Sequence, residues 1–68
     1  MSVIQAQEAF IDQVNSCVRP LDRMHRVRRS ANRTLAHYLA SVGYSEQQIS
    51  QAQIDAWDVA ELQNRSDA

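Results

Sequence analysis

The sequence is poor in residues that end secondary structure or cross-link a chain. It contains one glycine (Gly43) and one proline (Pro20) among 68 residues. So few turn-forming residues favour an all-helical chain with very short connections and argue against a β-rich fold. Cys17 is the only cysteine, so an internal disulfide bond is excluded. A lone thiol is typical of a reducing, intracellular compartment.

Long apolar segments and a secretory signal pattern are also missing. No stretch approaches the roughly 18 apolar residues that a membrane span requires. We therefore expect a cytoplasmic protein, located in the host cytoplasm if its source is viral, with 1–68 as a single helical domain. A chain of this size buries only about 60% of its unfolded surface. Without disulfides, self-association as a homodimer is the expected source of further stability.

Apolar residues at helical spacing predict three helices in a small bundle with a long central helix. The first helix, about 3–18, follows Ser2, a favourable N-cap. Its apolar face comprises Val3, Ala6, Phe10, Val14 and Cys17. The second helix, about 20–42, begins at Pro20, which suits a first helical turn. Its unbroken stripe comprises Leu21, Met24, Arg28, Ala31, Leu35, Tyr38 and Val42.

Local capping signals define the third helix, about 46–63. Gly43 follows the central helix at the place where a left-handed cap requires glycine. Ser45 and Gln48 have the spacing of a capping box. The face directed towards the core is small and consists of Ile49, Ala52, Ala56, Val59 and Ala60. Residues 65–68 are expected to form a frayed tail.

Charge is distributed unevenly. Six arginines and one acid give residues 19–33 a charge of +5, while the remaining residues carry −6, and lysine is absent. On the central helix an outward stripe opposite the apolar one is predicted to contain Arg19, Arg23, Arg26, Arg33 and His37. One interpretation is a solvated face, partly neutralised by Asp22 beside Arg26. The other is a recognition stripe, because arginine binds carboxylates and phosphates with two parallel hydrogen bonds.

Arg28 differs because it falls within the apolar stripe. A buried guanidinium without a partner is very costly. Three arrangements remain open: the side chain extends to solvent at the bundle edge, pairs with Asp12 or Glu61, or faces a partner molecule. We expect one of the first two, so that Arg28→Ala lowers stability more than Arg23→Ala.

Ile54 and Trp57 project away from the alanine face of the third helix. Trp57 either packs along the edge of the core or belongs to an exposed apolar patch of the kind that marks interfaces. The acidic residues of this helix are Asp55, Asp58 and Glu61. This acidic side and the arginine stripe can meet within one chain or across a dimer.

The turn at Gly43 resembles that of a helix-turn-helix, in which the following helix enters the major groove of DNA. In that interpretation the groove contacts are Gln47, Gln48, Ser50 and Gln51, because glutamine recognises adenine. The sequence pI near 6.0 and the long preceding helix argue against it.

Catalytic and metal chemistry have little support. Cys17 with His25 or His37 provides a thiol and a base, but Cys17 is predicted on an apolar face. Asp22 and His25 supply two metal ligands, whereas a zinc site requires about four. We therefore expect no enzyme activity, cofactor or metal.

The prediction is a small protein-binding module: an adaptor, a regulator or a stoichiometric inhibitor of a larger machine, of phage or plasmid type. The arginine stripe binds an acidic protein surface, and Ile54 and Trp57 provide apolar anchors. The alternatives are a nucleic-acid-binding transcriptional regulator and a structural homo-oligomer.

Overall fold

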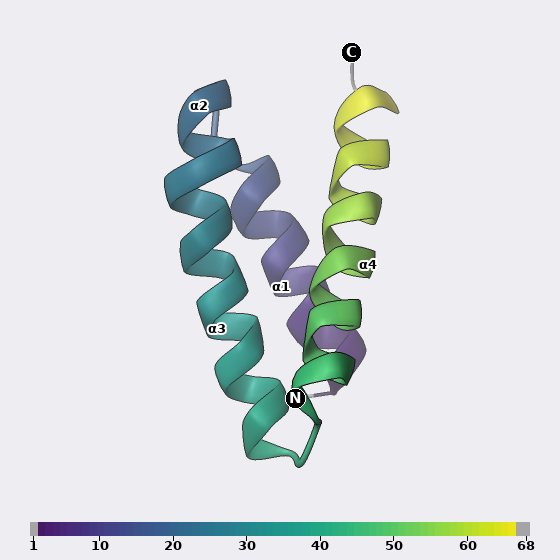
Figure 1. The fold of residues 1–68 in the computed structure, drawn as a ribbon. Coiled ribbons are helices and arrows are strands. Elements are labelled where there is room, and N and C mark those ends of the chain that lie inside the picture. The colour runs from purple at the N-terminus through teal and green to yellow at the C-terminus, as the bar shows by residue number, and fades with distance from the viewer. Residues whose placement is uncertain (1, 67–68) are drawn as a thin grey trace.

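Three helices run up, down and up in the computed structural model, which describes residues 2–66 (Figure 1). The elements are α1 (Val3–Asn15), α2 (Pro20–Asp22), η1 (Arg23–Val27), α3 (Arg28–Ser41) and α4 (Glu46–Ser66). Because α2, η1 and α3 join without a break, they form one helix, 20–41. The predicted all-α bundle with a long central helix is therefore confirmed. Over the described residues, no helix is long and apolar enough to span a membrane.

The start of α1 follows the prediction, but its end does not. Ser2 caps the helix and forms a capping box with Gln5, whose backbone N–H lies 3.1 Å from the Ser2 hydroxyl oxygen. The helix ends at Asn15, three residues before the predicted boundary, because the chain must turn before the proline that opens the next helix. Cys17 therefore lies outside α1 and not on its apolar face, and Val18, the last residue of the predicted helix, is 93% exposed.

A π-helical turn, η1, changes which residues of helix 20–41 face the core. A π turn contains more residues than an α turn, so the residues before it are displaced by about one position, or about 100°, relative to those after it. Leu21 and Met24, predicted in the core, are 73% and 51% exposed. Arg23, predicted in the outward stripe, is only 7% exposed. Both predictions assumed one uninterrupted α-helical phase, and the phase shift overturns them.

Gly43 ends α3 as predicted. Its φ of 95° lies in the left-handed region, which glycine adopts without steric cost. The N–H of Tyr44 donates to the carbonyl of Leu39 at 3.0 Å, and the N–H of Gly43 donates to that of Ala40 at 3.1 Å. These two bonds form a Schellman motif, which satisfies carbonyl groups at the helix end.

Ser45 starts α4 through the predicted capping box. The Ser45 N–H donates to Gln48 Oε1 at 2.9 Å, and the Gln48 N–H donates to Ser45 Oγ at 3.2 Å. The helix continues beyond the predicted end at 63 and includes Arg65 and Ser66. The predicted frayed tail, 65–68, overlaps the last two residues of α4 and stays a prediction, and 67–68 lie outside the described residues.

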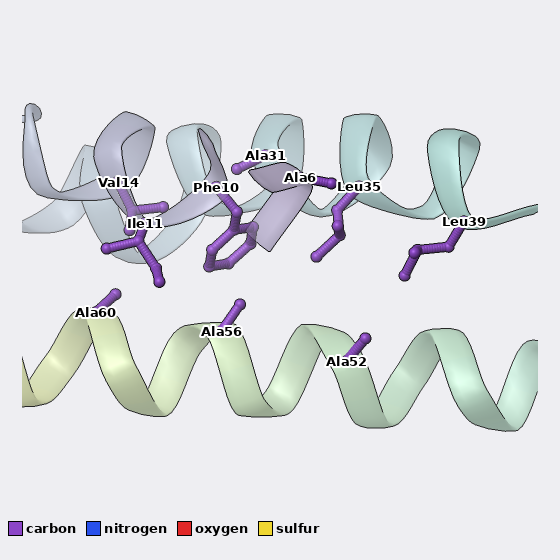
Figure 2. Packing of buried hydrophobic residues seen from close by; sticks show 10 residues of the cluster. All are labelled: Ala6, Phe10, Ile11, Val14, Ala31, Leu35, Leu39, Ala52, Ala56 and Ala60. Atoms are coloured by element: carbon purple, nitrogen blue, oxygen red, sulfur yellow. The ribbon is translucent and has the colours of Figure 1, made fainter. Parts of the chain in front are cut away.

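The core lies between α1, α3 and α4, and the buried residues that α4 contributes to it are all alanines, with Ile49 and Trp57 packed at its edge (Figure 2). The buried apolar residues are Ala6, Phe10, Ile11, Val14, Ala31, Leu35, Leu39, Ala52, Ala56 and Ala60. The three alanines of α4 recur every four residues, so they form one stripe facing the larger side chains of α1 and α3. A face without bulky side chains lets α4 approach both neighbours closely.

Polar side chains confirm this close approach, because they reach backbone carbonyls on neighbouring helices. The side-chain amides donate from Gln7 to Ala52 at 3.2 Å, from Asn15 to Ala60 at 3.2 Å, and from Gln53 to Asn32 at 2.9 Å. The first two bonds join α1 to α4, and the third joins α4 to α3. These bonds fix the helices in register along their length.

Candidate protein interface

Arg23 is a structural residue of the bundle. Its Nη1 lies 2.5 Å from Glu61 Oε1, and its Nη2 lies 2.9 Å from Asn15 Oδ1. Its guanidinium carbon lies 4.8 Å from the centre of the Trp57 ring. One side chain of η1 therefore connects α1 and α4. Arg23 is removed from the predicted partner-binding set because its cationic group is buried and already paired.

Arg28 and Trp57 pack against each other at the edge of the bundle. Both are half-buried, and the guanidinium carbon of Arg28 lies 4.0 Å from the centre of the indole ring. Arg28 thus adopts the predicted edge arrangement, while Glu61 pairs with Arg23 instead. Trp57 also contacts the apolar core. Of its two predicted interpretations the structure supports packing at the edge of the core, which leaves little of the ring available as a partner anchor.

The exposed arginine and histidine side chains of helix 20–41 lie on its outer surface. We call this surface the basic ridge; it comprises His25, Arg26, Arg29, Arg33 and His37, all exposed. His25, Arg29, Arg33 and His37 follow one another at four-residue steps, which places them along one face. The sequence prediction contains three of the five ridge residues, Arg26, Arg33 and His37. It omits His25 and Arg29. The predicted Arg19 is exposed and occupies the N-cap position immediately before Pro20, without a capping hydrogen bond from its side chain.

Most of the arginines on this surface have no acidic partner within the part of the chain that the structure describes. Arg26 lies 3.6 Å from Asp22, and its side chain is 80% exposed, so this pair is weak. Within residues 2–66, Arg19, Arg29 and Arg33 form no ion pair. Their guanidinium groups are therefore available to an acidic group of another molecule.

Apolar side chains lie at the N-terminal end of the basic ridge. Leu21 precedes His25 by four residues and continues the row by one turn. Met24 and Val18 border a surface hollow of about 290 Å³ between the 16–19 loop, helix 20–41 and α4. Ile54, the apolar anchor predicted on α4, is 52% exposed, as expected. The sequence missed Leu21 and Met24 as surface residues because both match the uninterrupted apolar stripe.

The predicted groove-reading residues lie at the other end of the bundle. All four of them, Gln47, Gln48, Ser50 and Gln51, are exposed in the first turns of α4. Gln48 is engaged in the capping box, and the Gln51 amide donates to Asp55 Oδ1 at 2.9 Å. Helices α3 and α4 run antiparallel side by side (Figure 1), whereas the helices of a helix-turn-helix cross steeply. These four residues lie on α4, whereas the basic ridge lies on helix 20–41.

Neither a reactive centre nor a known relative assigns a function to this surface. Within residues 2–66, no three His, Cys, Asp or Glu side chains lie close enough together to hold a metal ion. The thiol of Cys17 is half-buried and lies 3.6 Å from the carbonyl oxygen of Arg19. No protein-family model, curated protein or solved structure matches the chain.

Proposed function

We propose that this protein is a non-enzymatic binding module that recognises an acidic protein surface through the basic ridge. The observation that carries the proposal is the row of exposed arginines without acidic partners in the described chain. Each guanidinium binds a carboxylate through two parallel hydrogen bonds. Leu21 and Met24 provide an apolar contact at one end of the row, and Ile54 on α4 is also exposed; the anchors predicted from the sequence are Ile54 and Trp57.

The dimensions of the ridge suit a helix or strand of a partner protein. Residues four apart on a helix are separated by about 6 Å along its axis, so His25 and His37 lie about 18 Å apart. A partner that presents two or three carboxylates over this length satisfies the arginines. The lone thiol of Cys17 fits a reducing compartment, so we place this interaction in the cytoplasm.

An acidic protein is favoured over a nucleic acid because the positive surface is short. The chain carries eight acids and seven arginines, and several of the acids are exposed on α4. An extended nucleic-acid backbone covers acidic as well as basic surface of this protein, so part of its contact is repulsive. A short acidic patch on a partner protein contacts only the ridge. Nucleic-acid binding draws most of its affinity from many phosphate contacts.

The test compares three fluorescent probes in an anisotropy titration. The probes are an amphipathic helical peptide with rows of glutamate and leucine, the same peptide with glutamine for glutamate, and a random DNA duplex of about 20 base pairs. We expect the acidic peptide to bind most tightly. Arg29→Glu combined with Arg33→Glu should weaken its binding by at least about tenfold, because attraction becomes repulsion.

Arg65→Glu on α4 is the control, because it makes the same charge change as either single ridge reversal outside the ridge. We expect this variant to bind within about twofold of the wild type. If the ridge and control variants bind the acidic peptide equally, the ridge is not the recognition surface. If the DNA duplex binds more tightly than the peptide, with a steep dependence on salt, the nucleic-acid-binding regulator replaces the proposal.

A further inference from the structure

A second unpartnered surface lies between α1 and α4. It is a groove of about 390 Å³ lined only by residues of these two helices. Its apolar residues include Ile4, which is 66% exposed, Val59, which is 41% exposed, and the more deeply placed Ile11. Exposed apolar residues grouped in a groove are typical of a surface that another chain covers.

The rim of this groove is acidic. Glu8 of α1 and Asp55 of α4 line it, and Asp12 follows Glu8 by one turn on the same face of α1. Within residues 2–66 none of these three carboxylates forms an ion pair. The groove therefore favours an occupant with positive charge and some apolar surface.

The charge pattern separates two ways in which a second copy can cover the groove. A symmetric contact of groove against groove places the same carboxylates opposite one another, and like charges across an interface cost affinity. A contact of groove against basic ridge places carboxylates opposite arginines. It also brings Leu21 at the start of the ridge towards the apolar floor of the groove.

We propose that the basic ridge of one copy binds in the α1–α4 groove of the next. The proposal rests on the same ridge as the proposed function and identifies one acidic surface that the ridge recognises. The ridge and the groove are different patches on different helices, and the proposed arrangement uses one ridge and one groove in each contact, which makes it head-to-tail. Each copy then retains one free ridge and one free groove, which permits growth beyond a dimer. An acidic partner competes with this self-association for the ridge.

The first experiment is sedimentation velocity of the wild-type protein from about 10 µM to about 1 mM. We expect the weight-average mass to rise with concentration beyond that of a dimer. The ridge variant, Arg29→Glu with Arg33→Glu, and the groove variant, Glu8→Arg with Asp55→Arg, should each lower the association constant by at least about tenfold. All four substituted side chains are exposed, so folding should be retained, and circular dichroism checks this.

Mixing the two variants is the decisive measurement. The ridge variant has two acidic patches and the groove variant has two basic patches, so each resists self-association but complements the other. We expect an equimolar mixture to recover association to within about threefold of the wild type. The controls Arg65→Glu and Glu46→Arg reverse single charges outside both patches and should behave as the wild type.

Three results overturn the proposal: a wild-type protein that stays monomeric throughout, association that stops at a dimer and resists ridge reversal, or a mixture without recovery. The groove variant keeps the ridge intact, so its binding of the acidic peptide tests the proposed function independently of self-association. If it binds the acidic peptide while the wild type stays monomeric, only the head-to-tail contact is rejected. If the wild type associates as described but no acidic peptide binds, recognition of a foreign acidic partner is rejected.

Discussion

Replacing Arg23 with alanine should destabilise the protein more than any other single arginine substitution on helix 20–41. This order corrects the one expected from the sequence, in which Arg28 lies on the core side and Arg23 outside the core. The change removes the ion pair with Glu61, the hydrogen bond to Asn15 and the contact with Trp57. Removing one partner of a buried ion pair costs about 3–5 kcal/mol when the remaining charge has no compensation. The Glu61 side chain is 33% exposed, so water compensates part of this loss.

We therefore expect Arg23→Ala to lower the free energy of unfolding by about 3 kcal/mol, including about 1 kcal/mol for the lost contact with Trp57. A domain of this size has a total stability of about 3–10 kcal/mol, so the loss is a large fraction of it. The melting temperature should fall by about 10–25 °C. Arg28→Ala removes only a stacking contact and should cost about 1 kcal/mol. Arg26→Ala removes a weak surface pair and should cost less than about 0.5 kcal/mol.

The assay is urea unfolding at one protein concentration, followed by circular dichroism and by the fluorescence of Trp57, the only tryptophan. If Arg23→Ala is too unstable to measure, Arg23→Met combined with Glu61→Leu provides the second test. Replacing a buried ion pair with apolar residues of similar size often costs the protein little stability. The double variant should therefore have a higher free energy of unfolding than Arg23→Ala. If Arg28→Ala costs as much as Arg23→Ala, the burial of Arg23 is not important for stability and the reasoning fails.

Two further predictions concern the turn and the helix interface. Gly43→Ala should cost about 1–2 kcal/mol, because a side chain is strained at a φ of 95° although nothing lies within 4 Å of the added Cβ atom. Gly43→Asn, which tolerates this conformation better, should cost less in the same urea assay. Ala56→Leu should cost about 1–3 kcal/mol, because Ala56 is buried where α4 faces α1 and α3. Gln51→Leu, an exposed position on α4, is its control, and equal unfolding midpoints would contradict the packing argument.

The helix boundaries that follow from local chemistry could be predicted from the sequence. Ser2, Ser45 and Gly43 act through hydrogen bonds or backbone conformations within a few residues, so their roles can be read from their immediate neighbours. The alanine face of α4 was also predicted, because the spacing of its small residues is regular. These features depend on local sequence and not on contacts with distant parts of the chain.

The π turn could not be predicted in this way. Arg23 pairs with Glu61, which lies 38 residues away, so its inward orientation is tied to a contact between distant segments. The misplacement of Leu21 and Met24 follows from the same cause. The candidate site was predicted in part: Arg26, Arg33 and His37 are exposed as expected, whereas Arg23 and Trp57 belong to the bundle.

Because of the π turn, the number of residues in η1 determines which side chains face the core, as much as the identity of those residues does. Deleting one residue within η1 restores an uninterrupted α-helical phase, which rotates Leu21 and Met24 inward and Arg23 outward. Glu61 then loses its partner, although every residue outside η1 is unchanged. A single-codon insertion or deletion in this segment turns buried side chains outward and exposed side chains inward over two helical turns. No point substitution has this effect. Such events offer an evolutionary route to a new binding surface on an otherwise conserved bundle.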